Sequence, residues 1–263
     1  MGMDMDMGKA VGLIVPPSNP TLEVEIKALF DERPYVYTSR LPFCSDKTLE
    51  ERNKVYLESC VDTARRFGTL PLKGILVGCT GSNYRLGPVE DRRRCHEASI
   101  ELGTPLMSGS LAVLEMIQEL GFTKIQLELP YPDWLVALAV SYWEAAGLEV
   151  VAQHSLLKPI AAESAYQIQS DDLEHYLSSL EVPSDTLVLL SGTGMPTVGA
   201  IAELVQRFHA PLLSSNLCAA HWMLSRCEGG QGSILYHQLI GKLKSFSAAK
   251  DGGMVDNLFN PFG

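Results

Sequence analysis

The stretch GILVGCTG at residues 74–81 returns in altered form as LVLLSGTG at residues 187–194. Each copy is a short apolar run, as in a buried strand, followed by small and hydroxyl residues. In this alignment Cys79 stands where the second copy has Gly192. The chain therefore reads as two related halves, with a thiol in the first half and a glycine at the matching place in the second.

Two further pairs of segments support an internal duplication. The strand-like run Val11–Val15 ends at a proline, and so does its counterpart Lys124–Leu129. The segment PLMSGSLAVL at residues 105–114 parallels PLLSSNLCAA at residues 211–220, and both are typical of a strand, a serine-rich turn and a helix. Three ordered matches at a nearly constant offset predict the duplication of a single structural unit.

Apolar residues at helical spacing predict helices over residues 49–67, 134–146 and 198–208, the second of them ending at Gly147. Strands that alternate with helices favour parallel sheets, in which ligands bind beyond the carboxyl ends of the strands. The first candidate site residues are therefore those that come just after an expected strand: Asn19, Cys79, Tyr131 and Thr193.

The composition narrows the class of protein. The chain has 263 residues, of which 46% are hydrophobic and 20% charged, which is ordinary for a soluble globular protein. Its formal net charge of −10 disfavours nucleic acid as a partner. No apolar run approaches the roughly 18 residues of a membrane span, so no membrane association is expected.

The ends of the chain and the cysteines bear on the compartment. Residues 1–8 lack the basic region and apolar core of a signal peptide, and we expect residues 1–8 and 249–263 to be poorly ordered. The six cysteines show no CxxC spacing, which argues against a disulfide framework or a zinc site. These features predict a protein of the reducing cytoplasm.

Sequence motifs for metals and cofactors are missing. The six histidines show no HExxH pattern, and the chain has neither a GxGxxG fingerprint nor a P-loop. We therefore expect no metal and no cofactor. The basic run Arg92–Arg94 fits an exposed helix face, and it leaves open a contact in a homo-oligomer.

Cys79 has two interpretations. A free cysteine is most often a small buried hydrophobe. The polar and flexible run at residues 80–83 after it can, however, offer several backbone N–H groups. A thiol beside such donors has a lowered pKa and becomes a usable nucleophile or acid, and the same donors suit a carboxylate.

The other candidates also have structural alternatives. Asn19 lies in the run PPSNPTLE at residues 16–23, where it could cap a helix, hold a carboxylate, or do both. Tyr131 could donate a hydrogen bond into the cleft or serve as a turn aromatic. The turns contain no lysine or arginine before Arg85, so we expect N–H groups and hydroxyls, not arginine, to hold the substrate carboxylate.

Taken together, these segments resemble the aspartate/glutamate racemase superfamily, and within it the branch of the maleate isomerases and arylmalonate decarboxylases. The residues that carry the resemblance are those of the strand ends and turns: Gly12–Pro16, Ser18, Asn19, Glu23, Gly78–Thr80, Tyr131, Ser191–Gly194 and Pro211–Asn216. The likeness covers roughly residues 10 to 225.

The resemblance implies a fold and a site. The fold would be two flavodoxin-like α/β domains with parallel sheets, related by a pseudo-twofold axis, with a cofactor-free active site in the cleft between them. The first half would be residues 9–117, joined by a C-terminal helix over residues 216–248, and the second half residues 118–215. The helix after each serine-rich turn would cross to the opposite domain. Cys79 would be catalytic, and the substrate would be bound by Pro17, Asn19, Thr80, Gly81, Tyr131, Gly192, Thr193 and Asn216.

Members of the superfamily commonly place one cysteine on each face of the substrate. Here the second cysteine is replaced by Gly192, and inversion of a stereocentre requires an acid and a base on opposite faces, so a two-base racemase is disfavoured. A cysteine introduced at position 192 would be expected to restore the pair.

Three functions remain open. In the first, which the motif around Asn19 favours, the Cys79 thiolate adds to a small unsaturated dicarboxylate and catalyses cis–trans isomerisation, as in maleate isomerase. In the second, a substituted malonate loses CO₂ and Cys79 supplies the proton. In the third, the protein binds a small mono- or dicarboxylate without catalysis.

Overall fold

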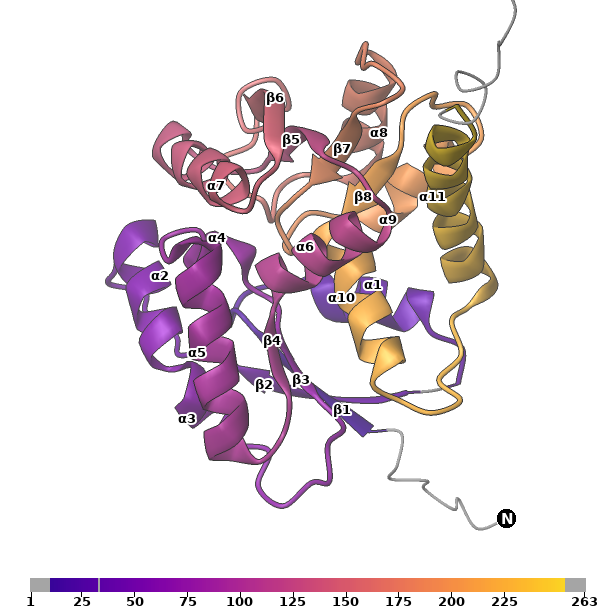
Figure 1. The fold of residues 1–263 in the computed structure, drawn as a ribbon. Helices are drawn as coiled ribbons and strands as arrows, with labels where there is room; N and C mark the ends of the chain where they lie inside the picture. The colour runs from indigo at the N-terminus through magenta and orange to yellow at the C-terminus, as the bar shows by residue number, and fades with distance from the viewer. Residues whose placement is uncertain (1–9, 33, 254–263) are drawn as a thin grey trace, which may run out of the picture.

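The computed structural model describes residues 10–32 and 34–253, which form two four-stranded parallel sheets (Figure 1). The strands of the first sheet lie in the order β2 (Tyr35–Arg40), β1 (Ala10–Val15), β3 (Ile75–Val77) and β4 (Leu106–Ser108). Those of the second sheet lie in the order β6 (Glu149–Ser155), β5 (Lys124–Leu129), β7 (Leu187–Leu190) and β8 (Leu212–Ser214). This shared order is flavodoxin-like, and it confirms the predicted α/β fold of two similar halves.

Strand β1 and strand β7 are buried along their whole length, which explains why they read as unbroken apolar runs in the sequence. In each sheet the chain leaves the first strand toward one neighbour and later returns on its other side, so β1 lies beside β3 and β5 lies beside β7. Such a switch point opens a crevice beyond the carboxyl ends of the two strands. The turns after β1, β3, β5 and β7 are thereby brought together.

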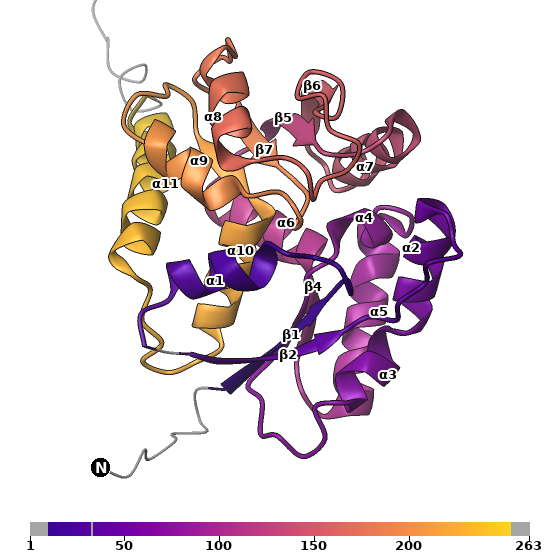
Figure 2. The ribbon, with the colours of Figure 1, turned by 180° about the vertical axis from the view of Figure 1, so that it is seen from behind.

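Helices cover both faces of the first sheet. One face carries α3 (Cys60–Arg65) and α5 (Gly87–Leu102), while α2 (Leu49–Glu58) packs on the short helix α4 (Thr80–Asn83). The other face carries α1 (Leu22–Leu29), which packs against α10 (Ser215–Ser225), a helix that follows the second sheet (Figure 2).

The second sheet is covered in a similar way. Helix α7 (Asp133–Ala145) packs against β6, and α8 (Ser170–Ser178) packs against α9 (Thr197–Leu204), which contacts β8. Helix α11 (Ile234–Gly253) contacts both α9 and α1. Within the described ranges, no helix is both long and apolar enough to cross a membrane.

The two serine-rich turns begin equivalent helices. Ser108 accepts a hydrogen bond from the Leu111 N–H at the start of α6 (Gly109–Glu119), and Ser214 accepts one from the Leu217 N–H at the start of α10. The two helices pack on each other at the junction of the halves, and α10 continues onto α1 and β3 of the first half. Since α10 also contacts β8 and α9, it packs on both halves, and the assignment of the C-terminal segment to the first half stays a prediction.

The helix boundaries differ from expectation in three places. The smallest difference is that α9 ends at Leu204, whereas the sequence predicted a helix up to Phe208. The single helix expected over residues 49–67 is interrupted at Ser59, where α3 turns away from α2 and buries Thr63, whose carbonyl accepts a hydrogen bond from Ser39 on β2. The C-terminal helix expected over 216–248 is two helices, because residues 226–233 contain Gly229 at a φ of +65° and pair with Phe30 through Gly232.

The expected poor order at the chain ends stays a prediction. Helix α11 extends to Gly253. Residues 1–8 and 254–263 lie outside the described residues.

A buried carboxylate, Glu25 of α1, joins the first half to the second. It accepts hydrogen bonds from the Val198 N–H at 2.7 Å and from the Thr197 hydroxyl at 3.1 Å, both in the first turn of α9, and also from the Asn216 side chain. Burial raises the pKa of Glu25 to about 7, although the hydrogen bonds from Asn216, Val198 and Thr197 act in the opposite direction.

A second buried carboxylate, Asp91 of α5, joins the halves elsewhere. It accepts hydrogen bonds from Tyr142 of α7 at 2.9 Å, from Ser108 at 2.7 Å and from Asn83 at 2.9 Å. Burial raises its pKa to about 6, again against the effect of its donors.

We predict that this protein loses stability as the pH rises toward 7, and that Glu25→Gln weakens this dependence. Because the folded-state pKa of Glu25 lies above its ordinary value of 4.5, the contribution of Glu25 to the free energy of unfolding is complete below about pH 4.5 and is lost as the pH rises through about 7. The effect amounts to at most about 3 kcal/mol.

Urea unfolding between pH 5 and pH 8 measures this dependence. Asp91→Asn is the comparison variant, because it removes only the Asp91 contribution, which is lost as the pH rises through about 6, and keeps the loss of stability near pH 7 that Glu25 causes. An unchanged pH slope in Glu25→Gln would contradict the assignment.

Candidate active site

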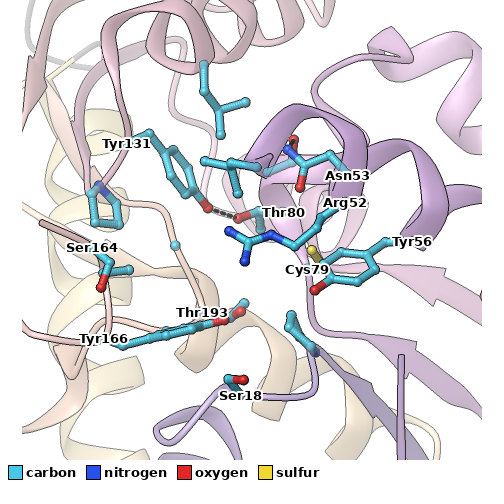
Figure 3. A pocket seen from close by; sticks show the side chains of 18 of the residues that line it. Ser18, Arg52, Asn53, Tyr56, Cys79, Thr80, Tyr131, Ser164, Tyr166 and Thr193 are labelled. Atoms are coloured by element: carbon cyan, nitrogen blue, oxygen red, sulfur yellow. Dashed lines mark hydrogen bonds between the residues drawn. The ribbon is translucent and has the colours of Figure 1, made fainter. Parts of the chain in front are cut away.

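A cavity of about 330 Å³ lies where the turns of the two halves meet (Figure 3). The first half contributes Pro16–Ser18 after β1, Cys79–Gly81 after β3, and part of α2 with the preceding loop. The second half contributes Pro130–Pro132 after β5, Gly192–Gly194 after β7, and the loop residues Glu163–Tyr166. The cavity is thus the crevice that the switch points of both sheets create.

Cys79 lies at the end of β3 and directly precedes α4. Its side chain is buried, yet it lines the cavity and lies near the side chains of Tyr56, Tyr131 and Tyr166. Burial raises the pKa of the thiol, and interactions with the Ser82 hydroxyl and N–H only partly oppose this. The lowered thiol pKa expected from the neighbouring N–H groups is therefore wrong, because desolvation of the Cys79 thiol dominates.

The side chain of Tyr131, a residue of the second half, contacts the first half. Its hydroxyl shares a hydrogen bond of 3.0 Å with the hydroxyl of Thr80. Burial raises the pKa of Tyr131 well above its usual value, so the phenol stays protonated and can donate. A Cβ atom on Gly81 would lie 3.4 Å from the Tyr131 ring, so the absence of a side chain at Gly81 leaves room beside the phenol.

The N–H groups of Thr80 and Gly81 begin α4 and have no partner within that helix. Together with the Tyr131 hydroxyl they form a neutral set of donors beside the sulfur. Such a set is suited to a carboxylate, because each hydrogen bond to a charged group contributes roughly 1.5–3 kcal/mol.

The turn after β7, in the second half, is hydrogen-bonded to residues of the first half. Thr193 donates its hydroxyl to the Gly78 carbonyl at 2.9 Å and accepts a hydrogen bond from the Asn19 amide at 3.1 Å. Thr21 donates to the Gly194 carbonyl at 2.8 Å. Among the hydrogen bonds of the described residues, none uses the N–H of Thr193 or Gly194. Both residues line the cavity, so their N–H groups are available as a second set of donors.

Seven of the nine residues expected in the site line the cavity: Pro17, Cys79, Thr80, Gly81, Tyr131, Gly192 and Thr193. Asn19 and Asn216 do not line it. The Asn19 oxygen caps α1 by accepting from the Thr21 and Leu22 N–H groups. The Asn216 amide is fully buried and donates to Glu25 and to the carbonyls of Thr193 and Met195. Both asparagines thus lie outside the cavity and donate hydrogen bonds to the turn that follows β7.

The place of the missing second cysteine is filled by a proline. A Cβ atom at Gly192 would lie 2.5 Å from Cγ and 2.8 Å from Cδ of Pro130. A cysteine at position 192 therefore does not fit without displacing that ring, contrary to the sequence-based expectation. The same Cβ would lie 3.4 Å from the Tyr131 hydroxyl, which is the nearest polar side-chain group on this face.

Several lining residues were not found by sequence reasoning. Arg52 and Tyr56 lie four residues apart on one side of α2 and both reach the cavity, a spacing that the sequence does contain. Tyr166 comes from an irregular loop with no sequence signal. Cys44 is a second thiol in the lining, and it donates to the Pro42 carbonyl at 3.7 Å. Among the described residues, no group of three or more histidines, cysteines or carboxylates could hold a metal ion.

The family model for arylmalonate decarboxylase matches residues 11–235, which is most of the chain. This chain belongs to the arylmalonate decarboxylase family. The expected membership in the maleate isomerase and arylmalonate decarboxylase branch of the aspartate/glutamate racemase superfamily is thereby confirmed.

Relatives in the family carry both names. Maleate isomerase of Geobacillus stearothermophilus is 29% identical over 218 residues, which cover 78% of this chain and 86% of that protein. Arylmalonate decarboxylase of Bordetella bronchiseptica is 26% identical over 223 residues, which cover 84% and 90%. A structure of a maleate cis–trans isomerase from Nocardia farcinica, a cysteine-to-serine mutant with a covalently bound succinylcysteine intermediate, shares the fold with a TM-score of 0.71 at 20% identity, over 87% of this chain and 98% of that one.

We predict that Gly192→Cys is destabilising and that Pro130→Ala partly rescues it. The alanine removes the two ring atoms that the new Cβ would strike, while the single variant overpacks the turn at a cost of about 1–3 kcal/mol. Recovery is partial because Gly192 has a φ of +157°, which side-chain-bearing residues rarely adopt. Thermal unfolding of the two single variants and the double variant measures the coupling. Additive effects would show that Pro130 is not the obstacle.

Proposed function

We propose that this protein is a cofactor-independent isomerase in which Cys79 adds to the double bond of a small unsaturated dicarboxylate, as in maleate isomerisation. The observation that carries the proposal is the placement of the Cys79 sulfur in a cavity, beside the Thr80 and Gly81 N–H groups and the Tyr131 hydroxyl. A nucleophile and a set of neutral donors for its substrate's carboxylate thus lie side by side. The succinylcysteine of the Nocardia farcinica isomerase supports attack by a thiol in this family.

The chemistry requires a single thiol. The thiolate forms a C–S bond to one alkene carbon, and the π electron pair moves onto the other carbon and its carboxylate, giving an enediolate that the donors stabilise. The former double bond is now single and rotates. The electron pair then re-forms the double bond in the trans geometry and expels the thiolate. The same thiol adds and leaves on one face, so the lack of a thiol at Gly192 does not prevent this route.

A decarboxylase of substituted malonates is the second candidate, and the raised pKa of the Cys79 thiol favours it. In that reaction the C–CO₂ bond breaks, its electron pair enters an enediolate, and the thiol protonates the α-carbon from one face. A thiol that stays protonated at neutral pH is a ready proton donor. The similarity to arylmalonate decarboxylase also supports this candidate. A carboxylate-binding protein without catalysis is the third.

Proton NMR in D₂O distinguishes the candidates. The protein is incubated with maleate and, separately, with substituted malonates. Fumarate formation from maleate indicates isomerisation by addition and elimination. Loss of CO₂ with deuterium at the α-carbon indicates decarboxylation. If neither reaction occurs and Cys79 also resists a small alkylating agent, both enzymatic proposals fail.

We predict that Cys79→Ala and Cys79→Ser each reduce turnover by about 10³-fold or more, because each removes the only thiol at the two duplicated turns. Cys44→Ser is the matched control, since Cys44 also lines the cavity but comes from another loop. Rates per folded protein, with circular dichroism to confirm folding, measure the effect. If the loss follows Cys44 instead, Cys79 is not the reacting group.

We predict that the pH dependence of turnover separates the two reactions. In isomerisation the thiolate attacks, so the rate rises with pH, and the rise lies above the ordinary thiol pKa because burial raises the pKa of Cys79. In decarboxylation the thiol is the acid, so the rate is flat at neutral pH and falls as the thiol ionises. Initial rates from pH 6 to pH 10 show whether turnover rises or falls with pH. An isomerase rate that falls over this range would exclude thiolate attack.

A further inference from the structure

Arg52 places a positive charge inside the cavity. It lies on α2, near the edge of the first half, and Figure 3 shows its guanidinium group among Tyr131, Thr80 and Thr193 in the middle of the pocket. The guanidinium also interacts electrostatically with Tyr56 and Tyr166, which face the same space. Among the lining residues, all of which the structure describes, Arg52 is the only cation.

The guanidinium has no carboxylate partner among the described residues. Arg85, the arginine that follows the first turn, pairs with Glu50 at 3.3 Å, whereas no ion pair or side-chain hydrogen bond involves Arg52. Glu163 is the only acidic residue in the lining, is exposed, and forms no ion pair with Arg52. A half-buried cation without a partner costs free energy that a bound anion would offset.

The position of Arg52 differs from both sets of neutral donors. The first set is the Thr80 and Gly81 N–H groups with the Tyr131 hydroxyl, and the second is the Thr193 and Gly194 N–H groups. Two carboxylates of one substrate can therefore be held without Arg52. A guanidinium that projects from a third element favours a third acidic group, because its planar donors match a carboxylate.

We propose that Arg52 is a specificity residue that selects a substrate with a third carboxylate, namely a maleate whose double bond carries an acidic substituent. This inference rests on the isomerase function proposed above. The substituent extends from the reacting carbons toward α2, and the guanidinium binds it there. The sequence-based expectation assigned the substrate carboxylate to N–H groups and hydroxyls, not to arginine. This proposal keeps those donors for two carboxylates and adds Arg52 for a third.

The test compares two substituted maleates by NMR, one with a carboxymethyl and one with a methyl substituent. For the natural protein, kcat/KM is expected to be about 10-fold or more higher for the triacid than for the methyl compound. Arg52→Met should lower this ratio by about 10-fold or more, and Arg52→Lys should give an intermediate ratio. Arg85→Met is the matched control and should leave the ratio unchanged.

Equal kcat/KM values for the two compounds, or a ratio unchanged in Arg52→Met, would overturn the assignment. If no maleate is turned over, the proposed function fails, and calorimetry on Cys79→Ser then decides the role of Arg52 separately. The triacid should bind about 10-fold or more tightly than the methyl compound, and Arg52→Met in the Cys79→Ser background should abolish the difference. Equal binding of the two compounds would also overturn the assignment.

Discussion

The hydrogen bond from the Thr193 hydroxyl to the Gly78 carbonyl fixes the distance between the two turns on which the site is built. One turn presents Cys79 and the other presents Gly192, and Asn19 supports the bond from the side by donating to the same hydroxyl. Since all three groups are buried, an unpaired member would carry the full cost of desolvation. The halves are therefore held in one arrangement, and the cavity between them has a defined shape before a substrate arrives.

Two buried carboxylates extend this constraint over the junction of the halves. Glu25 joins α1 to the start of α9, and Asp91 joins α5 to Tyr142 of α7. Each is surrounded by donors that favour its charged form, yet burial raises both pKa values. The contacts that hold the cleft together thus titrate between about pH 6 and pH 7. The geometry of the site and the stability of the fold depend on the same residues.

The duplicated fold does not produce a symmetric site. The first half offers a thiol and the guanidinium of Arg52, whereas at the matching turn the second half offers Gly192 covered by the Pro130 ring. A thiol at only one of the two matching turns suits a reaction in which a group is added and removed at the same face, or one in which a proton is delivered from one face. The Tyr131 phenol, which stays protonated, supplies neutral donation between the faces.

The sequence by itself determined the α/β class, the duplication and the turns that follow the strands, because apolar periodicity and strand-end residues are local properties of the chain. It also singled out Cys79, Tyr131 and Thr193, since the switch points of parallel sheets bring strand ends together. The tertiary structure alone decided that Asn19 and Asn216 act behind the cavity, that burial raises the Cys79 pKa, and that Arg52 and Pro130 shape the site. These properties depend on which side chains from distant segments are buried next to each other. Only the packing of the two halves determines those neighbours.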